Sequence, residues 1–162
     1  MAIPDGKLYH DGPLSAGTVA TLEDSSVNTE HAGANVGFGT GVVLNTDGKV
    51  VPATSGAIYG VAVKRTYVDA DHLYKDDIEN DCWKTGETLG VLRDGTIAVP
   101  ITVDVDRGEN AALDAGGKFK VAGANDTVVG VFLSSGNAGS TANLQTRVQF
   151  VAPAVPNNGG TK

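Results

Sequence analysis

Histidine and cysteine are the side chains in this chain best suited to catalysis or metal binding, and their spacing does not assemble a reactive site. His10, His31 and His72 lie far apart, and none has a partner at the spacing of a zinc site. Cys82 would need a nearby histidine base to act as a nucleophile, and its neighbour is Trp83. We therefore expect exposed loop histidines and a cysteine that serves as a small buried side chain.

A glycine-rich segment at 37–41 has the look of a loop that binds phosphate. It lacks the lysine and hydroxyl residue that follow such a loop, and no helical pattern begins after it. The Gly-x-Ser-x-Gly elbow of α/β hydrolases does not occur either. We interpret 37–41 as a bend at the entrance of a strand, and a small hydrolase has almost no support.

Acidic side chains gather between residues 69 and 81, where carboxylate oxygens could bind a hard cation. They are Asp69, Asp71, Asp76, Asp77, Glu79 and Asp81. The segment has no glycine at its centre, which a calcium-binding loop requires. The group at Asp104, Asp106 and Glu109 has the same defect. We favour solvated loops over a cation site, and predict no catalytic residue, no metal and no cofactor.

The composition narrows the class of protein. The formal net charge is −7, which argues against direct binding of nucleic acid, because phosphate-binding surfaces need clustered lysine and arginine. The 22 glycines and 6 prolines are spaced as turns between short strands would be. A single cysteine cannot form an internal disulfide. The chain begins without an apolar leader and has no apolar run of membrane-spanning length, so we expect no membrane partner.

Two stretches of the chain look like copies of each other. The first runs from Gly41 to Ala53 and is closed by Gly60–Val63. The second runs from Asn110 to Ala122 and is closed by Gly130–Leu133, with one residue inserted before the closing segment. The residues that match at one offset are Leu44 with Leu113, Gly48 with Gly117, Lys49 with Lys118, and Ala53 with Ala122.

Each copy is predicted to form a strand, a turn, a strand, a loop and a strand. The pairs Asp47–Gly48 and Gly116–Gly117 tolerate positive φ and favour tight hairpins, and Asp94–Gly95 gives a third such signal. We therefore assign Gly48, Gly95 and Gly117 as structural turn glycines. The two related β-units extend over about 38–63 and 108–133.

These patterns predict an all-β fold, a small β-barrel or β-sandwich with an extended N-terminal arm and a loose C-terminal tail. We divide the chain into an arm at 1–14, one β domain at 15–151 with an insertion at 64–85, and a tail at 152–162. Further strands are expected at 17–22, at 97–105 and at 142–150, where apolar residues alternate. Pro100 would put the second of these at a sheet edge or a bulge. Residues 23–35 are polar and predict a loop, and one short helical turn is predicted around 76–80.

Apolar side chains on the arm and aromatic side chains on the insertion are the candidate contact residues. On the arm they are Ile3, Leu8, Tyr9 and Leu14. On the insertion they are Tyr67, Tyr74 and Trp83. Apolar residues on a segment with little to bury in its own domain are commonly buried on a partner. For the three aromatics, packing onto the domain and contact with a partner remain equal alternatives.

The order of the glycine-containing motifs resembles the structural cement, or decoration, proteins of tailed-phage capsids over about residues 15–133. The motifs are Gly17-Thr-Val, Phe38-Gly39 before an apolar strand, Gly60-Val-Ala-Val63, Gly86-Glu87 before Val91-Leu92, Gly95-Thr-Ile-Ala-Val99, and Gly108. Each motif is short, so their order carries the resemblance.

This resemblance implies a β-rich virion protein without catalysis, made in the host cytoplasm and placed on the outer surface of the capsid. It would bind the major capsid protein and bridge neighbouring subunits against the pressure of packed DNA. A homo-oligomer is expected, with a trimer favoured over a dimer. The alternative is a carbohydrate-binding or adhesin-type β-module, in which Tyr67, Tyr74 and Trp83 would form a sugar platform.

Overall fold

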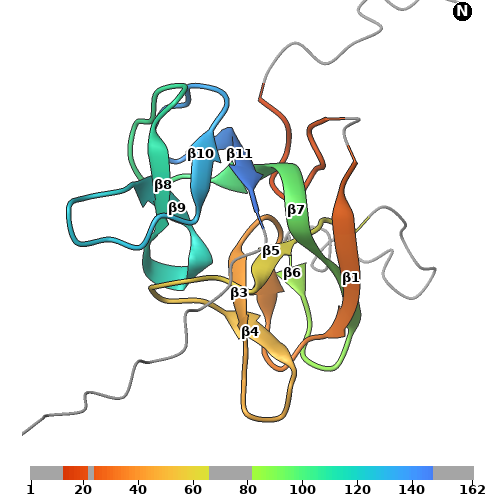
Figure 1. Ribbon diagram of the computed structural model, residues 1–162. Helices are drawn as coiled ribbons and strands as arrows, with labels where there is room; N and C mark the ends of the chain where they lie inside the picture. Colours follow the sequence, from red (N-terminus) through yellow and green to blue (C-terminus); the bar gives the residue numbers. More distant parts are fainter. Residues whose placement is uncertain (1–12, 22–23, 66–81, 148–162) are drawn as a thin grey trace, which may run out of the picture.

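A nine-stranded sheet that curls on itself forms the body of the molecule, in a computed structural model that describes residues 13–21, 24–65 and 82–147 (Figure 1). Its strand order is β4-β3-β5-β7-β11-β10-β8-β9, with β1 beside β7. A second sheet pairs β2 with β6. The all-β prediction is confirmed. No helix among the described residues is long and apolar enough to cross a bilayer.

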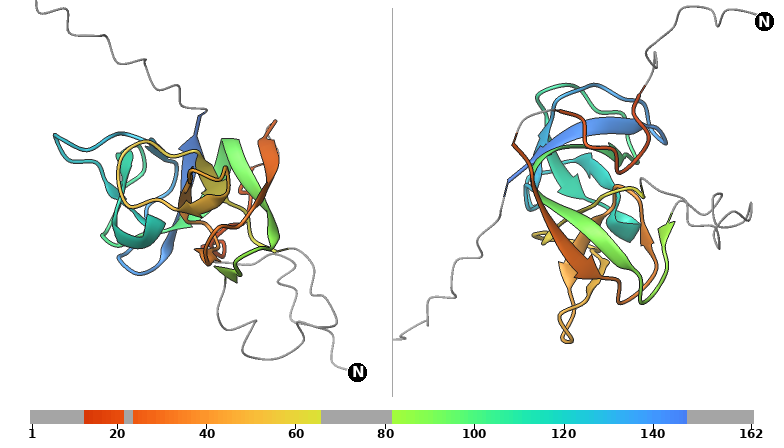
Figure 2. Two further views of the ribbon diagram at one scale, coloured as in Figure 1. Left: turned by 90° about the horizontal axis from the view of Figure 1, so that it is seen from below. Right: turned by 90° about the vertical axis from the view of Figure 1, so that its right-hand side faces the viewer.

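The longest strand, β7 (Thr88–Pro100), divides the body into two units. The first unit spans 26–94, contains the first half of β7, and holds β1 (Ser26–His31), β2 (Val36–Gly37), β3 (Gly41–Leu44), β4 (Val50–Pro52), β5 (Gly60–Ala62) and β6 (Cys82–Trp83). The second unit spans 95–147, contains the second half of β7, and holds β8 (Asn110–Leu113), the 3₁₀ turn η2 (Ala115–Gly117), β9 (Phe119–Val121), β10 (Gly130–Phe132) and β11 (Thr141–Thr146). The views in Figures 1 and 2 show the two units side by side.

The two units share one hydrogen-bonding pattern, which confirms the repeat and extends it. In the hairpins, Leu44 pairs with Val50 as Leu113 pairs with Phe119. On the other side of each hairpin, Val42 pairs with Gly60 as Ala111 pairs with Gly130. A duplicated register of this kind is specified by matching apolar faces and matching turns.

The repeat also includes the segments on either side of the hairpins. Parallel bridges join Ala32 to Val50 in the first unit and Ile101 to Phe119 in the second, and so help to close each curled unit. Antiparallel pairing joins β1 to the first half of β7, and the second half of β7 to β11. By this correspondence β1 is the counterpart of the second half of β7, and β7 belongs to both units.

Each unit has its own apolar core. The core of the first unit comprises Ala32, Val36, Val42, Val50, Ala62, Trp83, Leu89 and Val91. Seven of these residues have a counterpart in the larger second cluster, namely Ile101, Val105, Ala111, Phe119, Phe132, Ala142 and Leu144. That larger cluster also includes Ile58, Val61 and Leu92 of the first unit, so it joins the two units as well as filling the second.

Residues 23–35, predicted as a loop, contain strand β1. Sequence periodicity misses β1 because its half-buried side chains, Asn28 and Glu30, are polar. Both bond to the hydroxyl of Tyr59. Asn28 Nδ2 donates to the Tyr59 hydroxyl at 3.1 Å, and that hydroxyl donates to Glu30 Oε1 at 2.5 Å. Polar side chains with hydrogen-bond partners can lie on such a half-buried face.

The strands predicted around β7 are wrong in their boundaries. Asp94–Gly95 is not a hairpin, because β7 runs through it with φ +140° at Gly95. Pro100 ends β7, and Ile101 and Val105 then make separate bridges to Phe119 and Gly136.

Two other strand predictions are only partly met. Of the stretch 17–22, the structure describes residues 17–21, and these hold a single bridge, from Val19 to Ile97. The last strand, β11, ends at Thr146, and residues 148–150 lie outside the described part, as does the helical turn predicted at 76–80.

Candidate functional site

The described residues do not bring a reactive set together. In 13–21, 24–65 and 82–147, no three histidine, cysteine, aspartate or glutamate side chains are placed to hold a metal ion. Cys82 is half-buried in β6 opposite Gly37, and His31 Nδ1 lies 3.3 Å from Thr88 Oγ1. His10, His72 and the acids at 69–81 lie outside the described residues. The remaining candidates are the places where the arm and the insertion join the domain.

The segment after the N-terminal arm is tied to the second half of β7. Gly17 N–H donates to Ala98 O at 2.7 Å, and Ala98 N–H donates to Thr18 O at 2.9 Å. Lys64 N–H donates to Gly17 O at 2.8 Å from the other side. Residues 17–20 add an extended segment to the edge of β7. The arm, which precedes them, therefore joins the domain at a fixed point.

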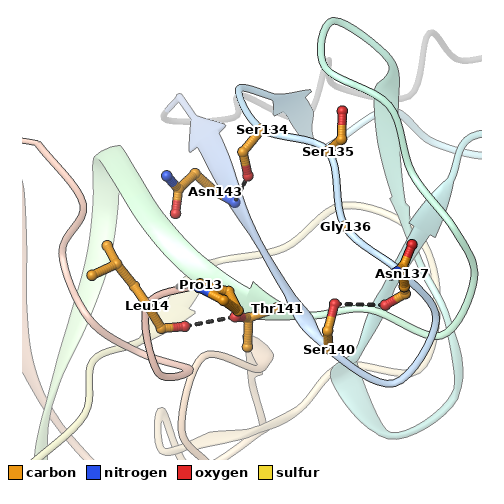
Figure 3. A pocket seen from close by; sticks show the side chains of 9 residues that line it. All are labelled: Pro13, Leu14, Ser134, Ser135, Gly136, Asn137, Ser140, Thr141 and Asn143. Carbon is orange, nitrogen blue, oxygen red and sulfur yellow. Dashed lines mark hydrogen bonds between the residues drawn. The ribbon is translucent and has the colours of Figure 1, made fainter. Parts of the chain in front are cut away.

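A hollow of about 400 Å³, lined mostly by polar residues, lies beside Pro13 and Leu14, where the arm joins the domain (Figure 3). Among the residues that line it, Thr141 Oγ1 donates to the Leu14 carbonyl at 2.6 Å, and Ser140 Oγ donates to Asn137 O at 2.6 Å. Its lining residues are Pro13, Leu14, Ser134, Ser135, Gly136, Asn137, Ser140, Thr141 and Asn143. Neutral hydroxyl and amide groups of this kind can bind another chain by hydrogen bonds but offer no charged group for catalysis.

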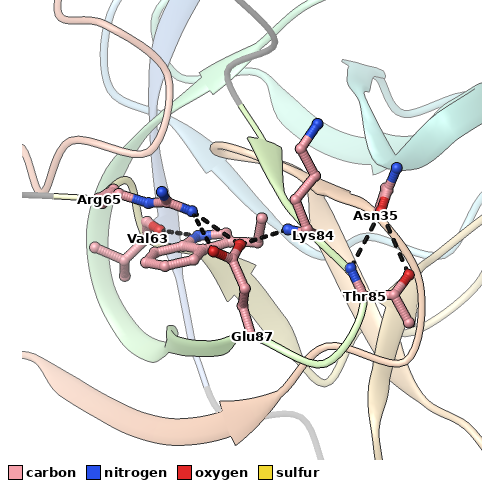
Figure 4. A network of polar contacts seen from close by, with 7 residues as sticks. Asn35, Val63, Arg65, Lys84, Thr85 and Glu87 are labelled. Atoms are coloured by element: carbon pink, nitrogen blue, oxygen red, sulfur yellow. Dashed lines mark hydrogen bonds and ion pairs between the residues drawn. The ribbon is translucent and has the colours of Figure 1, made fainter. Parts of the chain in front are cut away.

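The two ends of the insertion are clamped together by one network (Figure 4). The guanidinium of Arg65 lies 4.7 Å from the centroid of the Trp83 ring. Its Nη2 donates to both carboxylate oxygens of Glu87, at 2.9 and 2.8 Å. Lys84 N–H donates to the same carboxylate at 2.5 Å. Charge-assisted bonds and a cation–π contact hold this junction, so the insertion leaves the domain from a fixed stem.

Trp83 lies inside the domain, at 5 % exposure. Its Nε1 donates to the Val63 carbonyl at 2.8 Å, and its ring meets Phe38 edge to face with centroids 5.8 Å apart. The packing alternative therefore describes Trp83 in the isolated domain. A sugar platform needs an exposed ring, so nothing in the described residues favours the carbohydrate-binding alternative.

The other candidate contact residues have different locations. Leu14 is half-buried at the hollow. The other candidates, Ile3, Leu8, Tyr9, Tyr67 and Tyr74, lie outside the described residues, and their roles stay predictions. Sequence reasoning missed the Arg65–Glu87 pair, because its partners are far apart in the chain and no local motif marks them.

The three assigned turn glycines all have positive φ, at +73° for Gly48, +140° for Gly95 and +76° for Gly117. Gly48 and Gly117 lie in the two hairpins, and Gly95 lies within β7. Their positive φ values are suited to glycine, which has no Cβ.

Exposed apolar side chains are few and scattered among the described residues. The large ones are Val27, Leu44, Val103 and Val128. Lys120 and Asp126 form an ion pair: Lys120 Nζ lies 2.9 Å from Asp126 Oδ2, and this bond lowers the pKa of Asp126. The hydroxyl of Thr102 donates to Asp114 Oδ2 at 2.6 Å and lowers the pKa of Asp114, with help from the Ala115 amide.

Comparison with protein families gives one match that spans both units. The family model described as "Structural cement protein (E217 gp24/Pam3 gp6)" matches residues 8–147. A search of curated proteins finds no match.

Two solved structures share the fold at low sequence identity. The N base of head fiber gp8.5 in bacteriophage phi29 is 15 % identical with a TM-score of 0.54, over 78 % of this chain and 100 % of that chain. A chain from the capsid of Myoviridae phage XM1 is 16 % identical with a TM-score of 0.60, over 91 % of this chain and 98 % of that chain.

Proposed function

Because this chain belongs to the phage structural cement protein family, we propose that it binds the outer surface of a tailed-phage capsid and cements neighbouring subunits of the major capsid protein. Members of the family are structural virion proteins and not enzymes, so the chain is a capsid-associated component of the virion. The observation that carries the proposal is the family match over 8–147, which includes both units and the strand between them.

The double unit supports a bridging role. A protein that holds two capsid subunits together needs two attachment regions in a fixed relation. The shared strand β7 places the two units in such a relation. Many copies on one particle, each with several weak contacts, then hold the shell firmly through effective concentration.

The arm and the insertion are the proposed attachment segments, reaching the capsid or a neighbouring copy. Both leave the domain from fixed bases, one at the Thr141–Leu14 bond and the other at the Arg65–Glu87 pair. Their contact residues would be Ile3, Leu8, Tyr9, Leu14, Tyr67 and Tyr74. A homo-oligomer suits this task, with a trimer favoured over a dimer, because it offers the same patch to each symmetric capsid position. The chain itself performs no catalysis and does not touch the packed DNA.

Co-sedimentation with capsid shells assembled without this protein tests the proposal. We expect the full chain to pellet with such shells at a fixed stoichiometry and to raise their resistance to heat. Bovine serum albumin at the same concentration, as the control, should stay in the supernatant. Failure of the full chain to pellet with shells at low salt would exclude the cement role.

A further inference from the structure

We propose that the outer edge of β1 accepts an extended strand, supplied by residues 3–9 of a second copy of this chain. The inference rests on the proposed function for the homo-oligomer and for the place where copies meet, the capsid surface. The evidence for the edge itself comes from the internal repeat, in which the same edge occurs twice and is occupied once.

The outer edge of β1 has no strand beside it in the part of the chain that the structure describes. There β1 pairs only with β7, and Figure 1 shows it at the side of the molecule. Thr29 lies opposite Gly90. The Gly90 carbonyl accepts a hydrogen bond from the Val63 N–H, on the side of β7 away from β1. In an antiparallel pair of this type the N–H and C=O of both residues point away from each other. The backbone groups of Thr29 therefore point outward.

The corresponding edge in the second unit is occupied. Ala98 is the counterpart of Thr29, and its N–H and C=O bond to Thr18 and Gly17. Thr96 is the counterpart of Val27, and its C=O accepts from Ala20 N–H at 2.8 Å. An extended segment thus runs antiparallel along this edge, which is strand addition within one chain.

The side chains repeat this difference between the two edges. Thr96 and Ala98 are buried, at 1 % and 0 % exposure, whereas their counterparts Val27 and Thr29 are exposed. Val27, at 46 %, is one of the few large apolar side chains exposed among the described residues. An exposed edge with an apolar side chain is a site for pairing with another chain.

A hydroxyl at the end of the edge is repeated as well. Thr141 Oγ1 holds the carbonyl of Leu14, where the occupying segment begins. Its counterpart in the first unit is Thr88, which lies opposite His31 as Thr141 lies opposite Pro100. The first unit therefore has the donor that would anchor the start of a strand added to β1.

The arm contains a second version of the segment that occupies the β7 edge. That segment reads Leu14-Ser-Ala-Gly17-Thr-Val19, and the arm reads Ile3-Pro-Asp-Gly6-Lys-Leu8. Both have an apolar residue, then a glycine three positions later, then an apolar residue two positions after the glycine. Gly17 has φ +79° at this point, a value suited to glycine, which Gly6 would match.

A second copy is the occupant that suits the proposed homo-oligomer, because every copy then offers the same arm and the same edge. The chain's own arm could also reach this edge. Val63 N–H bonds to Gly90 O, and the next residue, Lys64, bonds to Gly17 O, three residues from Leu14. The experiment therefore distinguishes the arm of a second copy from the chain's own arm.

Disulfide trapping between two separately tagged chains tests the inference. Both chains carry Cys82→Ser; one also carries Lys7→Cys and the other Thr29→Cys, the pair that corresponds to Thr18 and Ala98. Mixed on shells, and in solution at high concentration, they should form the mixed disulfide, because paired strands bring the Cα atoms within bonding range. The matched control is Val128→Cys, which is exposed to a similar degree on another face.

A backbone block gives the second measurement. Thr29→Pro removes the outward N–H, whereas Thr29→Ala keeps it. Starting from a Tyr9→Cys chain and a Val27→Cys partner, the pair that corresponds to Ala20 and Thr96, Thr29→Pro should lower the yield of mixed disulfide about tenfold and Thr29→Ala should leave it unchanged. If Thr29→Pro does not fold, the Thr29→Cys and Val128→Cys comparison decides alone.

The outcomes separate this inference from the cement role. A mixed disulfide at Thr29 but not at Val128 supports it, on shells or in solution. Equal trapping at both positions overturns it, and so does a disulfide that forms only within one chain carrying Lys7→Cys and Thr29→Cys. Tagged Lys7→Cys and Thr29→Cys chains that pellet with shells but give no mixed disulfide leave the cement role standing and exclude the β1 edge.

Discussion

Trp83 and Gly136 occupy the same position in the two units, although one is the largest side chain and the other has none. Trp83 lies opposite Val36, and Gly136 lies opposite its counterpart Val105. A Cβ on Gly136 would come within 2.8 Å of Ile101 Cδ1, so the second unit has no room for a side chain there. The second core is filled from other positions, with Ile101, Phe119 and Phe132 in place of Ala32, Val50 and Ala62.

Trp83→Ala should therefore destabilise the fold rather than act first on binding. Removing a buried tryptophan costs about 3–5 kcal/mol, because the surrounding structure relaxes only partly into the cavity left behind. Chemical denaturation with tyrosine fluorescence measures the loss. The control Val128→Ala, on an exposed side chain, should change stability by less than about 0.5 kcal/mol. A Trp83→Ala protein as stable as the control would contradict the assignment of Trp83 to the core.

Gly48 and Gly117 form a matched pair for testing the hairpin turns. Both have positive φ, so Gly48→Ala should cost about 1–2 kcal/mol through backbone strain. A Cβ on Gly48 meets nothing within 4 Å, whereas one on Gly117 would lie 2.7 Å from the Gly41 carbonyl oxygen. We expect Gly117→Ala to cost about 1–3 kcal/mol more than Gly48→Ala. Equal melting temperatures would show that the close approach relaxes without cost.

The insertion should be removable without loss of the fold. The second unit joins β10 to β11 through residues 133–140, whereas the first joins β5 to β7 through the longer stretch 63–87. Replacing 66–81 with a Gly-Ser linker keeps the Arg65–Glu87 clamp and should leave the melting temperature within a few degrees.

Shell attachment by the shortened chain should be weaker, and the difference should be largest at low salt, where the acids of the insertion are least screened. A control insertion with each of those aspartates and glutamates replaced by asparagine or glutamine separates charge from length. Unchanged attachment by the shortened chain would show that the insertion is a solvated loop.

The hydrogen bond from Thr102 to Asp114 gives a prediction about pH. It lowers the pKa of Asp114 below the ordinary value of 3.8, so the bond adds stability above that value and loses it as pH falls through the lowered pKa. Thr102→Val should be less stable than the wild type at pH 7, and the difference should shrink below about pH 4. Thermal melts between pH 2.5 and pH 7 measure this difference in stability. Asp114→Asn is the control, because its side chain does not titrate.

The absence of catalysis can be tested by removing the reactive side chains together. We expect a variant in which His10, His31 and His72 become asparagine or glutamine and Cys82 becomes serine to bind shells within a few fold of the wild type. Its far-ultraviolet circular dichroism serves as the folding control. A correctly folded variant that has lost attachment entirely would place one of these groups in the function.

The repeat could be predicted from the sequence because its hairpin residues are local. Leu44 and Leu113, with Gly48 and Gly117, mark the same strand and turn in each copy, and the turn residues set the register. The full extent of the repeat could not be predicted. Its outer strands, β1 and the second half of β7, share almost no residue types, because one is exposed at an edge and the other is covered.

The candidate site was harder to predict than the fold. Trp83 lies in a polar stretch of the sequence, and only the long-range pairing of β2 with β6 places it in a core. Arg65 and Glu87 meet only because the strands on either side of the insertion come together. Asp94–Gly95 has the residues of a turn, but β1 pairs with β7 up to Asp94 and β11 pairs with it from Gly95 onward, which keeps the chain extended there.

A strand that belongs to two units leaves no hinge between them. Domains joined by a linker change their relative orientation freely, whereas here the joint is the middle of β7, paired to β1 and β5 before it and to β11 after it. A body attached to the first unit is therefore held at a set spacing and angle from a body attached to the second. In mechanical terms the chain is a rigid spacer rather than a flexible linker. It would fit only a surface whose neighbouring attachment points have the matching separation.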